Sequence, residues 1–106
     1  MTSSSSHSMQ NMTAEAPRLA EITQSLLFGD VWQRSGLSPR ERSIATVAAL
    51  TALYRLEQLP FHVQLAMDNG ISRAELGELI THLAFYAGWP AAASAVDVLA
   101  AIPHGK

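Results

Sequence analysis

Four polar side chains near the middle of the chain have the types that acid–base chemistry on a small molecule requires. Arg42 comes just before a strongly apolar segment, and Glu57, Gln58 and His62 follow that segment. A cation can hold an anionic substrate, and an imidazole can move a proton near neutral pH. We therefore take Arg42, Glu57 and His62 as candidate catalytic residues, and Arg42 and Gln58 as candidate substrate contacts.

His62 is the central residue of this set, and its sequence position predicts opposing effects on its basicity. We expect it within the first two turns of a helix, where the helix dipole favours anions and lowers imidazole basicity. Gln58 lies four residues earlier, on the same helix face, and a nearby carboxylate such as Glu57 would raise the pKa of the imidazole. The alternative is a buried, hydrogen-bonded histidine without a role in chemistry.

The other histidines are weaker candidates. His82 has Glu78 four residues before it, which is the spacing of a two-ligand metal face. No third ligand is identified, so an ordinary polar or interface pair fits better. His7 lies among serines, and we interpret it as having no ligand role. The sequence therefore predicts no metal site.

The segment that positions Arg42 has the pattern of a buried helix. Ser38 and Glu41 have the spacing of a capping box, and Pro39 suits the first helical position, so we predict that a helix begins at Pro39. From residue 44 to 53 the only polar side chains are two threonines, and the apolar residues do not fall in one stripe. This pattern is typical of a helix contacted on most of its circumference.

Four further helices are predicted from start and stop signals. They cover Pro17–Leu27, a segment from near Glu57 to Asn69-Gly70, Arg73–Ala87, and Ala91 to about Ile102. Ser72 and Glu75 repeat the capping box, and Gly88 is expected to end a helix in the left-handed conformation. No segment shows the alternation of a strand. The predicted fold class is all-α, with one domain of about five helices.

The start of the chain and one connection stand apart from these helices. Residues 1–14 are small, polar and without period, a composition that predicts disorder. We therefore expect the helical domain to cover residues 15–106. Phe28, Val31 and Trp32 form an aromatic connection before the helix at Pro39. We interpret it as a cover over one end of the bundle, and the alternative is a wall of a ligand site.

The composition excludes several classes of protein. Cysteine is absent, which excludes a disulfide framework, a thiol nucleophile and a Cys-ligated metal. The net charge is −2 and Lys106 is the single lysine, so no basic cluster suits a nucleic acid. No apolar run reaches the ~18 residues of a membrane span, and the N-terminus lacks the pattern of a secretory leader. We expect a cytoplasmic protein that binds neither nucleic acid nor membrane.

Two features predict that the chain assembles with copies of itself. Charged residues make up 15% of the chain, well below the usual quarter, which leaves few charges for a monomer surface. The helix predicted over residues 73–87 carries a core face and also a second stripe at helical spacing, formed by His82, Phe85, Tyr86 and Trp89. Two apolar stripes on one helix imply two packing partners. We therefore expect a homo-oligomer.

Several blocks of the sequence together resemble the carboxymuconolactone decarboxylase family, the wider group that includes alkyl hydroperoxidase D. The blocks are residues 37–43, 57–62, 69–76 and 82–90, and Tyr-Ala-Gly-Trp-Pro in the last block is the clearest mark. The match covers nearly everything from about Phe28 to Ile102. The resemblance implies an alkyl hydroperoxidase D-like helical domain that forms trimers or hexamers, with an active site at the histidine that matches His62.

The chain departs from the hydroperoxidase branch of that family. In that branch a Cys-x-x-Cys pair precedes the histidine, and the matching positions here are Arg55 and Gln58. The chain is therefore more similar to the decarboxylase branch, which uses no thiol, cofactor or metal, and whose polar residues match Arg42, Glu57 and His62. The resemblance implies a cofactor-independent carboxy-lyase that acts on a small carboxylated lactone or a related acid of aromatic catabolism, with His62 as general acid or base.

Two other functions stay open at this point, because many proteins share a fold without sharing a reaction. One is a non-catalytic small-molecule-binding or assembly module, and the other is an isomerase or hydrolase that uses the same histidine. Turnover of 4-carboxymuconolactone would separate the lyase from both. A ligand bound at His62 without turnover would favour the binding module.

Overall fold

The computed structural model describes residues 4–104, which are helical with no strand among them. The elements are α1 (Ser4–Glu15), α2 (Pro17–Ile22), the π-helix η1 (Thr23–Phe28), the 3-10 helix η2 (Val31–Gln33), α3 (Pro39–Ala52), α4 (Leu59–Asp68), α5 (Arg73–Ala87) and α6 (Trp89–Ala101). The predicted all-α class is confirmed, and α1 is additional to the five predicted helices. Within this part of the chain, no helix has the length and hydrophobicity to cross a membrane.

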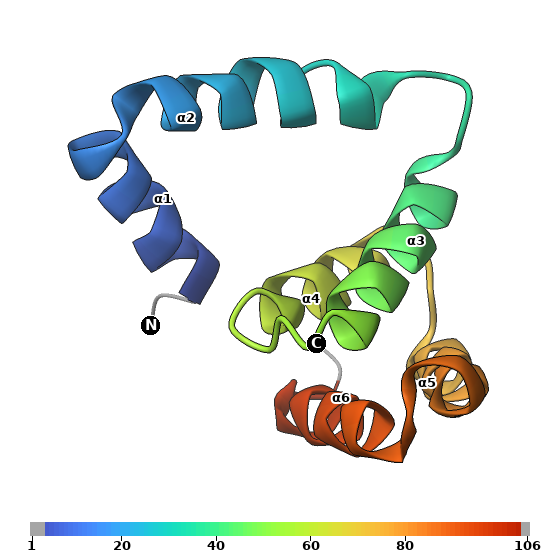
Figure 1. The fold of residues 1–106 in the computed structure, drawn as a ribbon. Helices are drawn as coiled ribbons and strands as arrows, with labels where there is room; N and C mark the ends of the chain where they lie inside the picture. Colours follow the sequence, from blue (N-terminus) through green and yellow to red (C-terminus); the bar gives the residue numbers. More distant parts are fainter. Residues whose placement is uncertain (1–3, 105–106) are drawn as a thin grey trace.

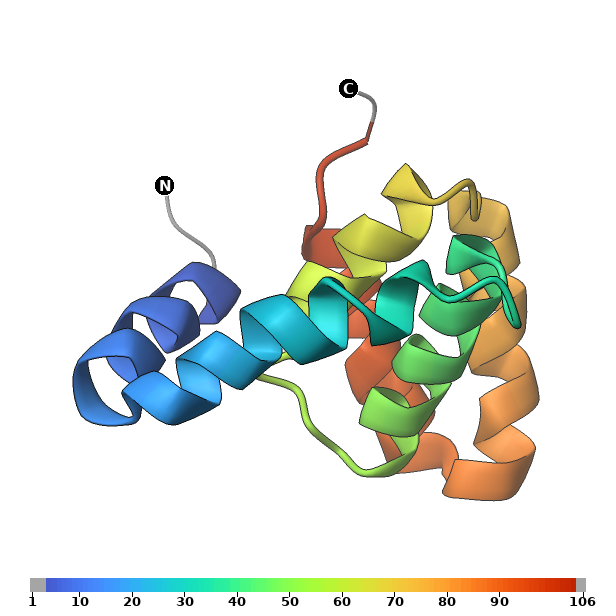
Figure 2. The same ribbon diagram turned by 90° about the horizontal axis from the view of Figure 1, so that it is seen from above.

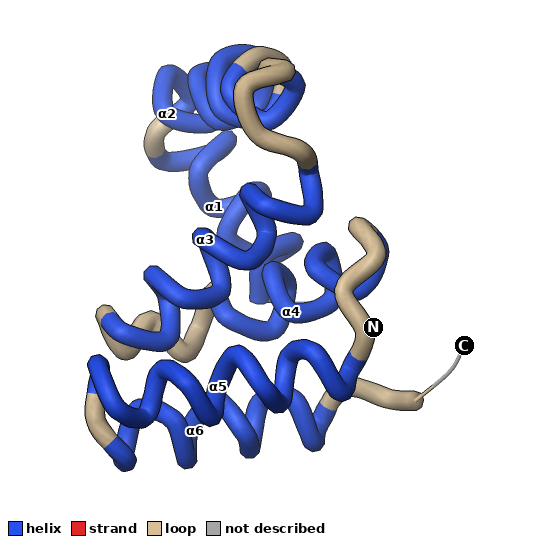
Figure 3. Tube along the Cα trace, turned by 90° about the vertical axis from the view of Figure 1, so that its right-hand side faces the viewer, coloured by secondary structure: helices blue, strands red, loops and turns tan. Residues whose placement is uncertain are grey.

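The helices form a body with an N-terminal arm. α5 and α6 lie side by side as a hairpin, and α3 and α4 pack together and against that hairpin (Figures 1 and 3). α2 and η1 continue as one rod that crosses the α3–α4 layer, while α1 folds back beside α2 and projects from the body (Figure 2). The rod leads directly into the connection that precedes α3.

The hydrophobic core lies between α3, α4, α5 and α6. α5 contributes its predicted core face, of which Leu76, Ile80 and Ala84 are buried. α6 contributes mainly alanines, whose small side chains allow close backbone approach. The buried core residues are Val47, Leu59, Val63, Ala66, Ile71, Leu76, Ile80, Ala84, Ala92, Ala95 and Leu99.

Helix α3 is contacted on most of its circumference, as predicted, because residues 42–51 are buried or half-buried apart from two alanines. Its buried residues lie on one stripe at i, i+4 and i+8, namely Ser43, Val47 and Thr51. Ala45 and Ala49, on other faces, are exposed in the single chain. The small polar residue Ser43 suits the packed face because the side-chain amide of Asn69 donates a hydrogen bond of 3.0 Å to its hydroxyl. The most deeply buried face of α3 is therefore more polar than the apolar run suggests.

The predicted starts of α3 and α5 are confirmed, and so is the role of glycine at the end of α4. Ser38 and Ser72 each form the expected capping box at a helix start. Gly70 has φ +98°, and the next backbone N–H, of Ile71, donates back to the Ala66 carbonyl oxygen at 3.0 Å. This is the Schellman arrangement, in which a left-handed residue satisfies carbonyl groups at a helix end.

The end of α3 uses the same left-handed conformation with a less suitable residue. Tyr54 has φ +60°, a region that disfavours residues other than glycine by roughly 1–2 kcal/mol. Its hydroxyl and the Ser94 hydroxyl share a hydrogen bond of 3.0 Å, which ties the end of α3 to α6. This contact to α6 supports Tyr54 in a conformation that the sequence did not predict.

The predicted helix over Pro17–Leu27 is present, but its second half is π-helical. α2 passes into η1, and the N–H of Gly29 closes the turn on Leu26. A Cβ atom on Gly29 would lie 2.7 Å from the carbonyl oxygen of Ser25, so only glycine fits at this end without a shift. The wider π turn changes the direction in which Phe28 and the following residues leave the helix.

The structure differs from the predicted disorder of residues 1–14. α1 covers Ser4–Glu15 and contacts α2 and α4. Its half-buried Met12 lies against Thr23, whose hydroxyl is 3.8 Å from the methionine sulfur. Packing of this kind is a tertiary effect that composition does not reveal. Residues 1–3 lie outside the described part, and the domain boundary at residue 15 stays a prediction.

Candidate active site

The four predicted site residues fall into an inner and an outer pair. Arg42 lies in the first turn of α3 and His62 in the first turn of α4, and both are half-buried. Glu57 lies in the turn before α4 and Gln58 is the N-cap residue of α4, and both are exposed. The two helices that carry the inner pair pack directly against each other.

A short segment before α3 contacts both inner residues. We call residues 28–34 the connector. The Trp32 ring stacks against the His62 imidazole, with centroids 6.1 Å apart and planes inclined by 20°. The Arg34 carbonyl oxygen accepts a hydrogen bond of 3.1 Å from Nη2 of Arg42. The connector thus joins the two half-buried polar side chains of the site.

The His62 imidazole lies in aromatic surroundings. Besides Trp32, the neighbouring Phe61 ring meets it edge to face at 5.0 Å. Burial lowers the pKa of His62 from its ordinary value near 6.5, because the charged form loses hydration. Its Nδ1 atom is buried and has no hydrogen-bond partner among the described residues. Among the described residues the ring is therefore held by aromatic packing and not by a hydrogen bond at Nδ1.

Arg42 is held by a neutral group and keeps an open donor. Its guanidinium donates to the Arg34 carbonyl, and within residues 4–104 it forms no ion pair. Its Nε atom is buried without a hydrogen-bond partner, like Nδ1 of His62. A buried donor left unpaired is disfavoured by roughly 1–3 kcal/mol, and an anionic ligand would satisfy it.

The outer pair does not take part in this arrangement. No hydrogen bond or ion pair joins Glu57 or Gln58 to His62 or Arg42 in the described part of the chain. The lowered pKa of His62 is caused by burial. The expected effect of Glu57 on the imidazole therefore has no direct contact to carry it in this structure.

Trp32 is the site candidate that sequence reasoning did not select. Its position in a short connection between helices predicted a cover over the bundle, and the wall of a ligand site was the alternative. The ring is half-buried and stacks on a side chain thirty positions later in the chain. The only signal in the sequence was a large aromatic residue in a short connection.

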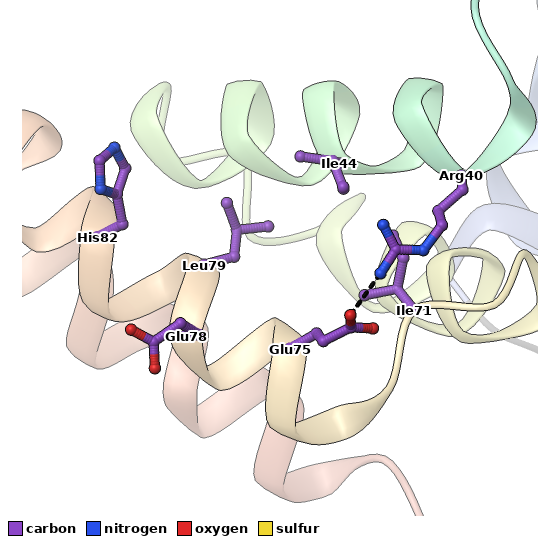
Figure 4. A pocket seen from close by; sticks show the side chains of 7 residues that line it. All are labelled: Arg40, Ile44, Ile71, Glu75, Glu78, Leu79 and His82. Atoms are coloured by element: carbon purple, nitrogen blue, oxygen red, sulfur yellow. Dashed lines mark hydrogen bonds and ion pairs between the residues drawn. The ribbon is translucent and has the colours of Figure 1, made fainter.

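A hollow between α3 and α5 lies apart from these residues. It has a volume of about 430 Å³ and is lined by Arg40, Ile44, Ile71, Glu75, Glu78, Leu79 and His82 (Figure 4). An ion pair between Arg40 and Glu75 lies at one end, while Glu78 and His82 point in different directions. The described residues include no group of three His, Asp or Glu side chains placed to hold a metal ion. The geometry suits an open groove with a mixed polar and apolar lining.

Comparison with known proteins identifies the relatives of this chain. The model of the carboxymuconolactone decarboxylase family matches residues 17–101. A 4-carboxymuconolactone decarboxylase from Acinetobacter baylyi is 35% identical over 91 residues, which cover 86% of this chain and 68% of that protein. A nitrosuccinic acid decarboxylase from Metarhizium robertsii is 29% identical over 92 residues, which cover 87% of this chain and 64% of that protein.

A third relative is an uncharacterised 15.0 kDa protein from Paracoccus denitrificans, 27% identical over 92 residues that cover 85% of this chain and 69% of that protein. This chain thus spans about two thirds of the length of the relatives that it matches. The family model covers α2 to α6, including the connector and all four predicted site residues. The chain belongs to the carboxymuconolactone decarboxylase family.

Proposed function

We propose that this protein is a cofactor-independent carboxy-lyase that acts on a small carboxylated lactone or a related acid of aromatic catabolism. The observation that carries the proposal is the half-buried His62 imidazole with an unpartnered Nδ1, joined through the connector to an Arg42 that has no carboxylate partner. Two relatives named as decarboxylases support the reaction class.

In the proposed reaction, Arg42 binds a carboxylate of the substrate and His62 moves the proton. The C–C bond to the leaving carboxylate breaks and CO₂ departs. The electron pair of the broken bond stays on the substrate and passes into the adjacent unsaturated carbonyl system. The His62 imidazolium then donates a proton to carbon, and water restores the proton to the ring. The Arg42 charge stabilises the anionic intermediate before that transfer.

The lowered pKa of His62 gives this scheme a definite pH dependence. The imidazolium is a stronger acid than a free histidine, and it is the minor form at neutral pH. If the imidazolium is the donor, kcat/KM should be highest at acidic pH and should fall as the pH rises through the His62 pKa, on the acid side of 6.5. A general-base role would give the opposite slope.

We also propose that the protein works as a homo-oligomer, a trimer or a hexamer. The support for this is an exposed aromatic stripe at the end of α5 and the start of α6. Phe85 and Tyr86 of α5 and Trp89, the first residue of α6, are 72%, 79% and 64% exposed in the single chain. An apolar groove of about 300 Å³ between α5 and α6 continues this surface. Burying such side chains stabilises an assembly by ~25 cal/mol per Å² of apolar area.

The decisive experiment follows the ultraviolet absorbance of 4-carboxymuconolactone with the purified protein. Nitrosuccinate serves as a second substrate because a relative bears its name. Loss of absorbance with release of CO₂ supports the lyase. Binding of the lactone without turnover supports the non-catalytic binding module, and a product that retains its carboxylate supports an isomerase or hydrolase.

A parallel assay tests the branch of the family. The chain contains no cysteine, so Arg55 and Gln58 cannot supply the thiolate that a thiol peroxidase needs. We expect no dithiol-dependent consumption of hydrogen peroxide or of an alkyl hydroperoxide above a control without protein. Consumption that scales with protein concentration would contradict the assignment.

A further inference from the structure

Three rings form a nearly parallel series that ends on the imidazole of the proposed site. Phe28 stacks on Trp32 with centroids 5.9 Å apart and planes inclined by 25°, and Trp32 stacks on His62 at 6.1 Å and 20°. These distances lie in the range in which aromatic pairs attract each other. One face of the His62 ring is therefore covered by an indole that is itself supported from behind.

The connector that carries Trp32 is closed at both of its ends. The Gln33 side-chain amide donates back to the Phe28 carbonyl at 3.1 Å, and the Gln33 backbone N–H donates to the Asp30 carbonyl at 2.9 Å. At the far end, Arg42 holds the Arg34 carbonyl. These bonds restrict the backbone around Trp32, so the position of its ring is defined by more than the stacking itself.

We propose that Trp32 is a positioning residue for His62: its indole fixes the plane of the imidazole, excludes water from one face, and leaves the ring nitrogens to the substrate. The inference rests on the proposed role of His62 as proton donor. A flat ring covered on one face and met at its edge by Phe61 has few orientations, and a fixed donor is what proton transfer to carbon requires.

The burial that lowers the His62 pKa is consistent with this role, because hydrophobic rings replace water around the charged form. No ion pair or side-chain hydrogen bond joins His62 to any charged group in the described part of the chain. The charged groups on the connector, on the segment between α3 and α4, and on α4 with the helices that contact it are Glu15, Asp30, Arg34, Arg40, Glu41, Arg42, Arg55, Glu57, Asp68 and Asp97. Removing the indole should therefore act mainly through hydration of the ring.

The test compares Trp32→Ala, Trp32→Phe and the control Val31→Ala in the full chain. Val31 belongs to the same 3-10 turn, is 37% exposed, and takes no part in the ring series. The His62 proton on Cε1 is titrated by NMR, and its signal is assigned by its loss in His62→Gln. Trp32→Ala should raise the His62 pKa toward 6.5, Trp32→Phe should keep most of the shift, and Val31→Ala should leave it unchanged.

Turnover gives a second and independent readout. Trp32→Ala should lower kcat by about 10- to 100-fold with a smaller change in KM, because a misplaced donor affects the chemical step more than binding. Trp32→Phe should restore most of the rate. An unchanged His62 pKa in Trp32→Ala, or an equal change in Val31→Ala, would overturn the positioning role.

The two proposals fail in different ways. If the His62 titration responds as expected but the wild-type protein converts no substrate, Trp32 still positions the ring and the lyase assignment is wrong. If turnover is present and the titration does not respond, the lyase stands and the role of Trp32 is wrong. Should Trp32→Ala lose its helical circular dichroism, Trp32→Leu replaces it, and an unshifted His62 pKa in that variant overturns the proposal.

Discussion

Two of the histidines, His62 and His82, have aromatic neighbours and lie in opposite environments. His62 on α4 is half-buried between Trp32 and Phe61. His82 on α5 is exposed, and its partner Tyr86, at 5.0 Å, is 79% exposed. The ring pairs are similar in distance, so the difference lies in what covers them.

The two histidines differ in cover because their helices, α4 and α5, have different neighbours. α4 lies among α1, α3 and α6, and Trp32 of the connector reaches its first turn. α5 packs its core face on α3 and α6, and its second stripe has no partner within residues 4–104. One aromatic histidine is thus enclosed by its own chain, while the other is available to another copy. This contrast supports the proposals of chemistry at the first histidine and of assembly at the second.

Removing each histidine in turn is the strongest way to break this comparison. His62→Ala should reduce turnover by about 10²- to 10⁴-fold, the usual contribution of a general acid. His82→Ala is the matched control and should retain turnover if the oligomer persists. Steady-state assays and light scattering should be run on both variants. Equal turnover by His62→Ala and the wild-type protein would contradict the role of His62 in catalysis and favour the alternative of a structural histidine.

A charge placed in the exposed stripe tests the other half of the comparison. Phe85→Glu puts a carboxylate on the α5 surface, where burial against an apolar partner would cost several kcal/mol without a compensating cation. Light scattering should show smaller species than it does for the wild-type protein, which we expect to be a trimer or a hexamer. Ala74→Glu is a useful control, because Ala74 is an exposed α5 residue outside both the stripe and the groove between α5 and α6. A wild-type protein with monomer mass at micromolar concentration would contradict assembly itself.

Local signals in the sequence predicted the helices of the body well. Ser38 with Glu41 and Ser72 with Glu75 form capping boxes because both partners lie within one helical turn. Gly70 and Gly88 have positive φ, as their places after helices predicted. α4 begins at Leu59, two residues later than predicted, since the N-cap of this helix has no side-chain hydrogen bond to mark it.

Features that depend on tertiary packing were not predictable in this way. The π turn of η1 and the left-handed Tyr54 have no local sequence signal, and both are supported by contacts elsewhere. α1 has a polar composition that suggests disorder, yet it contacts α2 and α4. The burial of Ser43 on α3 depends on Asn69, which lies 26 residues later.

For the site, residue type was a better guide than closeness along the sequence. Arg42 and His62 were selected by their chemistry, and the structure joins both to the connector. Glu57 was selected by its closeness in sequence, and it is exposed without a contact to either. Closeness along a chain does not determine direction in a turn, so the partner that does cover His62 came from thirty positions away.

The role of Arg42 sharpens the contrast between the enclosed site and the exposed stripe. Arg42→Ala removes a charge-assisted contact of roughly 1.5–3 kcal/mol to a substrate carboxylate, so we expect about a 10- to 100-fold loss in kcat/KM. The loss should fall mainly on KM if the contact is equally strong in the ground and transition states. Arg40→Ala is the matched control, because Arg40 pairs with Glu75 at the hollow between α3 and α5. Equal losses in both variants would indicate a general effect of charge.

The smallest expected effect concerns the pH dependence of stability. In the folded chain the pKa of His62 lies below 6.5, its ordinary value, which we take for the unfolded chain. As the pH falls, the unfolded chain therefore binds the proton before the folded chain does. The free energy of unfolding should therefore decrease as the pH falls from about 6.5 to the folded pKa, and this contribution should be fully present above 6.5. The glutamine of His62→Gln cannot titrate, so this variant should lose less stability than the wild-type protein over that range.

Denaturant unfolding at pH 8, 7, 6 and 5 measures the difference, with His82→Gln as the exposed control. If the unfolding free energy of the wild-type protein changed with pH as that of His62→Gln does, the ring would be as hydrated in the folded chain as in the unfolded one. Burial would then no longer distinguish the two histidines.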